Sequence, residues 1–194
     1  MRLYNTLSQK EEEFIPQGAQ VKMYVCGITP YAPCHVGHAM SYVIFDVLRR
    51  YLESRGYSVF HIQNFTDIDD KIIGRASKEN LSYRELADHY IKEFTSNMSQ
   101  LNIRQAHAYP LATDAIPKIV EIIVGLIEKG YAYAADGGVY FRVTKGLNYG
   151  KLSRRSLDSM LAGARVDVIR GKEHPMDFAL WKTAKDGEPS WDSP

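Results

Sequence analysis

The feature that most constrains the fold is the stretch from Val21 to His38, VKMYVCGITPYAPCHVGH. It begins with an apolar, strand-like run that ends at Cys26-Gly27, passes through a proline-containing turn, and reaches His35 at the start of an amphipathic segment. In open parallel sheets, ligands bind beyond the carboxyl ends of the strands, where the next helix offers unpaired N–H groups to phosphate. The sequence therefore predicts an α/β fold with a nucleotide site at this turn.

The following segments complete a strand–helix–strand unit. Apolar residues recur with helical spacing over residues 39–57, and Gly56 is suited to ending that helix. Residues 58–65, SVFHIQNF, mix β-branched and aromatic side chains and predict a second strand. A connection of this length allows parallel pairing. The end of the second strand, at Thr66, is therefore expected beside the end of the first, at Cys26.

Three carboxylates follow the second predicted strand, in the segment TDIDDK: Asp67, Asp69 and Asp70. Oxygen ligands of this kind suit magnesium. Asp69 or Asp70 at the start of a helix is also suited to capping its unpaired N–H groups. Capping is the favoured interpretation, and a magnesium site stays open as the alternative.

The rest of the chain predicts further helices and a hairpin. Helices are expected over 71–80 and 82–102, the second with Ser82 and Glu85 as a capping box. After residue 104 a helix over 114–129 is followed by a hairpin that turns at Asp-Gly-Gly 136–138. The first 20 residues predict a short extended segment, Arg2 to Leu7, and then a charged loop that closes at 16–18.

The motif His35-Val36-Gly37-His38 resembles the HIGH signature of class I aminoacyl-tRNA synthetases. Its context, MYVCGITPYAPCHVGH, resembles the cysteinyl-tRNA synthetases, as do NFTDIDDKII and HPMDFALWK further on. The resemblance covers essentially all 194 residues. It implies a Rossmann-like parallel sheet, the first half of a class I catalytic domain, over 1–103. It further implies an α+β connective insertion over 104–174, and a return strand toward the catalytic domain over 175–194.

For the nucleotide, the resemblance implies that His35 and His38 contact ATP phosphates and act catalytically, while Gly37 keeps the adenosine side open. Activation of an amino acid requires its carboxylate to attack the α-phosphate of ATP, so catalysis is mainly positioning and charge stabilisation. Histidines at a helix N-terminus are able to donate to phosphate oxygens. The alternative from the residues alone is that they only cap the helix.

For the amino acid, the resemblance implies that Gly27, Thr29 and Thr66 bind cysteine and that Cys26 is a zinc ligand. The family holds zinc with two cysteines, a histidine and a glutamate, and Cys26 matches the first cysteine. Zinc with an open position selects a thiolate over a hydroxyl, which shape alone separates poorly. From composition alone, a strand cysteine is a small buried hydrophobe, and Cys34 is interpreted in that way.

Composition sets few limits on partners. A formal net charge of +1 does not by itself indicate a polyanion partner, so tRNA binding must depend on local patches of positive charge. The basic residues of the insertion either contact tRNA phosphates or are simply solvated: Arg154, Arg155 and Arg165. Two cysteines form no disulfide framework, and neither a signal peptide nor a membrane-length apolar run is found, so a cytoplasmic protein without membrane or DNA partners is expected.

The expected partners are ATP with Mg²⁺, L-cysteine and tRNA(Cys). The family's next motif, G-W-H-x-E-C, with three zinc ligands, and its KMSKS loop are absent from these 194 residues. We therefore expect the chain alone to be inactive, because a zinc site needs three or four ligands. Two alternatives stay open: a ligase that joins cysteine to an amino sugar, as in mycothiol synthesis, and a non-catalytic paralogue that binds nucleotide.

Overall fold

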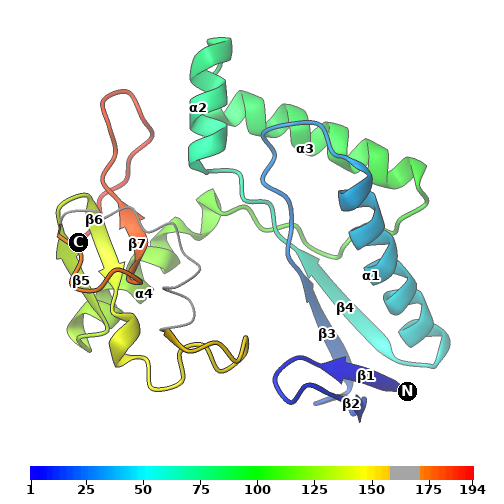
Figure 1. The fold of residues 1–194 in the computed structure, drawn as a ribbon. Coiled ribbons are helices and arrows are strands. Elements are labelled where there is room, and N and C mark those ends of the chain that lie inside the picture. Colours follow the sequence, from blue (N-terminus) through cyan, green and yellow to red (C-terminus); the bar gives the residue numbers. More distant parts are fainter. Residues whose placement is uncertain (158–170) are drawn as a thin grey trace. The chain divides into compact units, whose positions relative to one another are not determined.

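The computed structural model describes residues 1–157 and 171–194 (Figure 1). Arg165, one of the basic residues of the predicted insertion, lies outside the described residues. The chain forms two compact units. One is the continuous segment Ile15–Ile116, and the other combines Met1–Phe14 with Pro117–Pro194. Each unit is described below by itself.

A parallel pair of strands forms the centre of the first unit. β3 (Gln20–Val25) and β4 (Ser58–Gln63) run in parallel and are connected by helix α1 (Val36–Ser54) (Figure 1). α1 ends at Arg55, and Gly56 has a φ of 87°, a conformation that favours glycine. The predicted strand–helix–strand unit is confirmed.

A further segment runs along the edge of β4 that faces away from β3. Ile62 and Phe65 form parallel bridges with Ala108 and Leu111, and the backbone N–H of Gln63 donates to the Ala108 carbonyl at 3.1 Å. This segment satisfies backbone groups that the edge of β4 would otherwise leave open. The compact unit therefore extends beyond residue 103, where the sequence predicted a boundary. The assignment of 1–103 and 104–174 to catalytic domain and insertion stays a prediction.

Helices α2 and α3 each begin at a capping side chain, and they pack against each other. α2 (Asp70–Glu79) begins after Asp69, whose carboxylate accepts from the Lys71 N–H at 2.8 Å, so the capping interpretation of Asp69 is confirmed. α3 (Tyr83–Gln100) begins with the predicted capping box of Ser82 and Glu85. The core on the sheet is apolar and aromatic, and its helical side chains come from α1 and α3: Val25, Ile28, Tyr42, Phe65, Phe94 and Met98.

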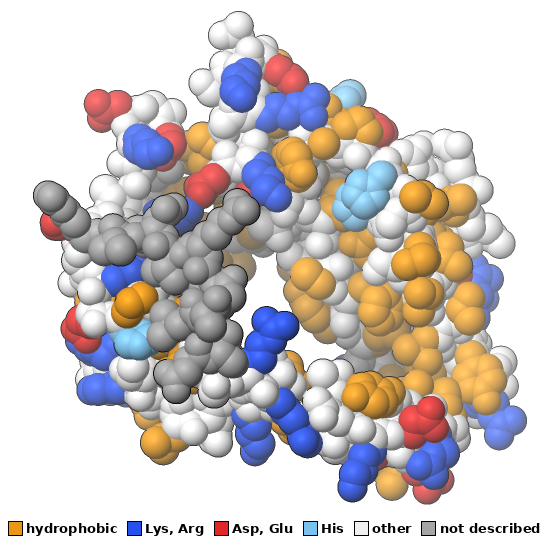
Figure 2. Space-filling model, viewed as in Figure 1, with side chains coloured by type: hydrophobic (Ala, Val, Ile, Leu, Met, Phe, Trp, Pro, Cys, Tyr) orange, Lys and Arg blue, Asp and Glu red, His pale blue; other side chains and the backbone are white. Residues whose placement is uncertain are grey.

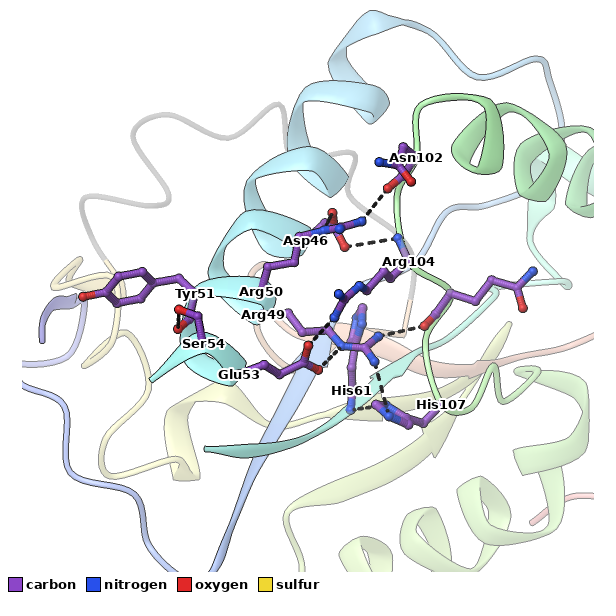
Figure 3. Close-up of polar contacts among 11 residues, drawn as sticks. Asp46, Arg49, Arg50, Tyr51, Glu53, Ser54, His61, Asn102, Arg104 and His107 are labelled. Carbon is purple, nitrogen blue, oxygen red and sulfur yellow. Dashed lines mark hydrogen bonds and ion pairs between the residues drawn. The ribbon is translucent and has the colours of Figure 1, made fainter. Parts of the chain in front are cut away.

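A cluster of hydrogen-bonded polar side chains connects α1 with β4 and with the segment after α3 (Figure 3). Arg49, only 8% exposed, bonds Glu53 at 2.9 Å and donates to the Gln105 carbonyl at 2.8 Å. Hydrogen bonding and charge from Arg49 lower the pKa of Glu53. The imidazole of His107 accepts through Nδ1 from the backbone N–H of His61 at 2.9 Å. The buried guanidinium of Arg49 thus has partners, which is what the burial of a charge requires.

A row of apolar side chains is exposed along α1 with helical spacing: Val36, Met40, Ile44, Val47 and Tyr51, between 46% and 85% exposed. Figure 2 shows hydrophobic side chains gathered over this part of the molecule. Surfaces of this kind favour association when nothing covers them. No described helix is both long and apolar enough to cross a membrane.

The second unit contains α4 (Ile116–Glu128) except for its first residue, which belongs to the other unit. The helix is followed by a sheet of order β5-β6-β7. β5 (Ala132–Ala135) and β6 (Gly138–Phe141) form the hairpin that the sequence predicted. The hydrophobic core here joins α4 to the sheet: Ile119, Ile123, Leu126, Ala132, Val139 and Leu180.

The strand β7 (Phe178–Lys182) pairs antiparallel with β6. β7 thus becomes the third strand of the sheet that contains the hairpin. The return of residues 175–194 toward the catalytic domain stays a prediction. Asp177, only 2% exposed, fixes the start of β7 because its carboxylate accepts from the Tyr133 hydroxyl at 2.7 Å and the Val143 N–H at 3.0 Å.

The amino terminus forms a second hairpin in this unit. β1 (Arg2–Asn5) agrees with the predicted extended segment and pairs antiparallel with β2 (Lys10–Glu13). The prediction of a charged loop is wrong for residues 10–13. The strand KEEE is exposed at every position, so it has no apolar alternation from which to predict it.

Candidate active site

The carboxyl ends of β3 and β4 lie at one edge, because Val25 is opposite Gln63 in the parallel register. The next residues are hydrogen-bonded across that edge: the Gly27 N–H donates to Asn64 Oδ1 at 2.8 Å. A Cβ on Gly27 would lie 1.4 Å from the Asn64 carbonyl oxygen. Only glycine therefore allows the two strand ends to approach this closely.

Thr66 is tied to the same edge. Its backbone N–H donates to the Ile28 carbonyl at 3.0 Å, and its Oγ1 accepts from Asn64 Nδ2 at 3.3 Å. Thr29, half-buried, accepts through its carbonyl from the Tyr31 N–H at 2.9 Å in the turn that follows β3. Of the three predicted cysteine-binding residues, Gly27 and Thr66 are thus connected through one side chain, and Thr29 lies two residues after Gly27.

The two histidines of the motif cap α1. His35 is the N-cap residue, and its Nδ1 accepts from the Gly37 N–H at 3.1 Å. His38 Nδ1 accepts from the His35 N–H at 3.2 Å, and the rings stack with centroids 4.0 Å apart. Partial burial, with a contribution from His35, lowers the pKa of His38, so its ring is neutral at pH 7. A neutral ring that accepts through Nδ1 carries its proton on Nε2.

Gly37 has a steric role in this cap. A Cβ at position 37 would lie 2.9 Å from Cε1 and 3.0 Å from Nδ1 of His35. Both distances are shorter than ordinary contacts, so a side chain here would push the His35 ring out of its capping position. The open adenosine side that the motif implies for Gly37 stays a prediction.

Cys26 is exposed at the end of β3, and its carbonyl accepts from the Tyr42 hydroxyl at 3.2 Å. Burial raises the pKa of Tyr42 to about 12, so this hydroxyl keeps its proton. Within residues 1–157 and 171–194, no three His, Cys, Asp or Glu side chains are grouped so as to hold a metal ion. Zinc needs three or four protein ligands, so the described residues do not by themselves fit a zinc ion.

The third carboxylate of the TDIDDK segment, Asp67, has a structural role. It is buried, and its two oxygens accept from the backbone N–H of Thr113 at 3.0 Å and from the Thr113 hydroxyl at 2.5 Å. With Asp69 used as the cap of α2, two of the three carboxylates are engaged by the protein itself. The magnesium alternative gains no support from this geometry.

Sequence reasoning missed two residues of this edge, Asn64 and Tyr42. Asn64 links Gly27 to Thr66, and Tyr42 reaches the Cys26 carbonyl from α1. Each had a signal in the sequence. Asn64 is a polar residue near the carboxyl end of the predicted strand 58–65, where ligand-binding residues of parallel sheets converge. Tyr42 lies one helical turn after His38, which places it on the same side of the helix.

The fold is that of the catalytic domain of a class I tRNA synthetase. A family model described as the catalytic domain of class I (C) tRNA synthetases matches residues 13–194. The match covers most of the chain, and the chain therefore belongs to this family.

Curated relatives narrow the class. The protein of Dehalococcoides mccartyi strain BAV1 is 60% identical over 195 residues, and that of Caldicellulosiruptor saccharolyticus is 51% identical. Both carry the name cysteine–tRNA ligase, as does the 50% identical protein of Aquifex aeolicus. Each match covers all of this chain but only 43%, 42% and 39% of these relatives. The chain thus spans less than half of their length.

Solved structures agree on the fold. Methionyl-tRNA synthetase of Mycobacterium tuberculosis, bound to methionyl-adenylate, superposes with a TM-score of 0.55 at 21% identity, over 61% of this chain and 24% of that one. A leucyl-tRNA synthetase of Agrobacterium radiobacter K84 gives 0.52 at 22% identity, over 65% and 17%. At these identities the likeness shows the fold alone, and it confirms the predicted Rossmann-like α/β architecture.

Proposed function

We propose that the complete gene product containing this chain is a cysteine–tRNA ligase. It activates cysteine with ATP to cysteinyl-adenylate and transfers the cysteinyl group to tRNA(Cys). The observation that carries the proposal is the match of the whole chain, at 60% and 58% identity, to two relatives named cysteine–tRNA ligase. Because the chain spans only 43% of each relative, the proposal concerns the complete product and not these 194 residues alone.

For the nucleotide, we assign ATP to the start of α1, with Mg²⁺ accompanying its phosphates. The capping geometry supports this assignment, because His35 and His38 use Nδ1 in the cap and keep an Nε2–H donor. Such donors stabilise the charge that develops on the phosphate oxygens as the cysteine carboxylate attacks and pyrophosphate leaves. No nucleophile on the protein is required. Gly37 is assigned to the adenosine side.

For the amino acid, we assign cysteine to the edge formed by Gly27, Thr29 and Thr66. Hydrogen bonds that join two of these residues through Asn64 support one common pocket. We also propose Cys26 as one zinc ligand, since thiolate is a ligand that selects zinc. The remaining ligands are not among the described residues. A cytoplasmic location follows from a chain with two cysteines and no disulfide framework.

The test is cysteine-dependent exchange of pyrophosphate into ATP, followed by cysteinylation of tRNA(Cys), with the complete gene product. Its size is first measured by immunoblot of a source-cell extract. Exchange with transfer to tRNA supports the proposal. Exchange with transfer only to an amino sugar would assign the mycothiol-type reaction instead, and ATP binding without exchange would assign a non-catalytic paralogue.

The isolated 194-residue chain makes a separate prediction. We expect no cysteine-dependent exchange from it, because the described residues provide only one proposed zinc ligand and zinc needs at least three. The complete product, assayed under the same conditions, is the positive control. Exchange by the isolated chain would show that the described residues suffice for activation.

A further inference from the structure

Asn64, the residue that follows β4, has its amide group fixed by its neighbours. Its Oδ1 accepts two hydrogen bonds, from the Gly27 N–H at 2.8 Å and from the Tyr24 hydroxyl at 2.8 Å. A backbone N–H is only a donor, so the atom that faces it must be the amide oxygen and not the amide nitrogen. The NH₂ group of Asn64 is thereby directed to the opposite side, toward Thr66.

The orientation of Asn64 decides the role of the Thr66 hydroxyl. Asn64 Nδ2 lies 3.3 Å from Thr66 Oγ1 and is only a donor, so the threonine oxygen must accept in this bond. The hydroxyl proton of Thr66 then points away from Asn64. Because the Thr66 N–H is bonded to the Ile28 carbonyl, the backbone on which this hydroxyl sits is fixed as well. Thr66 therefore keeps an O–H donor that is directed away from Asn64.

We propose that Asn64 is a positioning residue, which fixes the Thr66 hydroxyl as a hydrogen-bond donor to an acceptor group of the amino-acid substrate. The inference depends on the proposed function, in which Thr66 lines the cysteine pocket. A hydroxyl that must donate favours an anionic acceptor, such as a carboxylate or a thiolate. A rotating hydroxyl would have to be ordered at binding, and Asn64 removes that cost in advance.

The sharpest variant is Asn64→Asp, which has nearly the same shape. An aspartate oxygen still accepts from Gly27 and Tyr24, but the other oxygen now accepts from Thr66 and draws its hydroxyl proton out of the pocket. In the complete gene product we expect the KM for cysteine to rise about tenfold or more, because the substrate loses a hydrogen bond to one of its charged groups. The KM for ATP should change less than about twofold, because that site is assigned to the start of α1.

A double-mutant cycle with Thr66→Val separates this role from added charge or lost stability. If Asn64 acts through the Thr66 hydroxyl, Asn64→Asp raises the cysteine KM in the wild-type background and has almost no further effect in Thr66→Val. A charge effect persists in both backgrounds. Asn64→Ser, which is too short to reach Thr66, serves as a second variant and should show the same dependence on background. Asn148→Asp, at an exposed position, controls for the charge change.

Pyrophosphate exchange, with thermal melting of each variant, gives the outcomes. Equal effects of Asn64→Asp in both backgrounds overturn the role of Asn64 while the proposed function stands. A wild-type product that shows no cysteine-dependent exchange overturns the proposed function, and this inference with it. An effect confined to the background that contains Thr66 supports both.

Discussion

Replacement of Gly27 by alanine tests whether the edge between β3 and β4 is as tightly built as its geometry indicates. The added Cβ would lie 1.4 Å from the carbonyl oxygen of Asn64 and 2.6 Å from its carbonyl carbon. An ordinary contact needs more than 3 Å, and neither atom belongs to a flexible side chain. The two strand ends must therefore move apart by more than an ångström, as an order-of-magnitude geometric estimate.

The expected loss in free energy of unfolding is estimated from the contacts that this movement breaks. Overpacking alone costs about 1–3 kcal/mol. The Gly27 bond to Asn64 Oδ1 and the Thr66 bond to the Ile28 carbonyl cross the same edge, and each contributes about 1 kcal/mol. We expect Gly27→Ala to lower the free energy of unfolding by about 4 kcal/mol, a large share of a typical domain stability of about 5–15 kcal/mol.

Urea denaturation of the 194-residue chain, followed by circular dichroism, measures this loss as a shift of the midpoint to lower urea. Gly74→Ala is the matched control, since it lies within α2 with nothing inside 4 Å of its Cβ position. It should stabilise the helix by about 0.5–1 kcal/mol. A Gly27→Ala variant that unfolds within about 0.5 kcal/mol of wild type would refute the steric argument.

Three further changes have defined outcomes. His35→Ser keeps an N-cap acceptor but removes the ring, so the free energy of unfolding from thermal melts should stay within about 0.5 kcal/mol of wild type. Pyrophosphate exchange by the complete product should fall at least about tenfold, and unchanged exchange would contradict the phosphate role. Burial, then repulsion from Arg49 and His107, lowers the pKa of His61 below its ordinary 6.5, so the unfolded chain takes up a proton that the folded chain excludes. Stability should be greatest above pH 6.5 and fall as the pH drops below it, and His61→Leu should flatten this fall in thermal melts; an unchanged slope would place the titrating group elsewhere. Asp177→Ala should cost about 3 kcal/mol, because it removes the acceptor of the buried Val143 N–H and of the Tyr133 hydroxyl proton. Hydrogen exchange in β5 and β6 should accelerate, and protection equal to wild type would be evidence against this anchor.

Local patterns predicted most of the elements because their causes are local. The periodicity of α1, the stop at Gly56 and the capping box at Ser82 each depend on residues within one or two turns. β2 escaped prediction because its four residues are all exposed, and pairing with β1 holds it in place instead of burial. The segment beside β4 also escaped, since its bridges join residues 46 positions apart in the chain.

The site shows the same division. The motif and its context identified His35, Gly37 and His38, whose contacts are all within four residues of one another. Asn64 was not identified as a site residue, because its role depends on the parallel register that brings it to Gly27, 37 residues earlier. The meeting of the two strand ends was predictable, and a polar residue near one of them was visible in the sequence, whereas its contact with Gly27 depends on the register.

Histidine suits the start of α1 because one imidazole ring is able both to accept a hydrogen bond and to donate one. An N-cap must accept a hydrogen bond, which excludes lysine and arginine because they only donate. A phosphate site needs hydrogen-bond donors that point outward. Aspartate, a common helix cap, has no donor to offer when it is ionised. Imidazole suits both uses, because it accepts through Nδ1 within the cap and keeps an N–H donor at Nε2. With His35 at the N-cap, His38 at N3 and no side chain at Gly37 to displace the first ring, capping and phosphate binding are compatible uses of the same two residues.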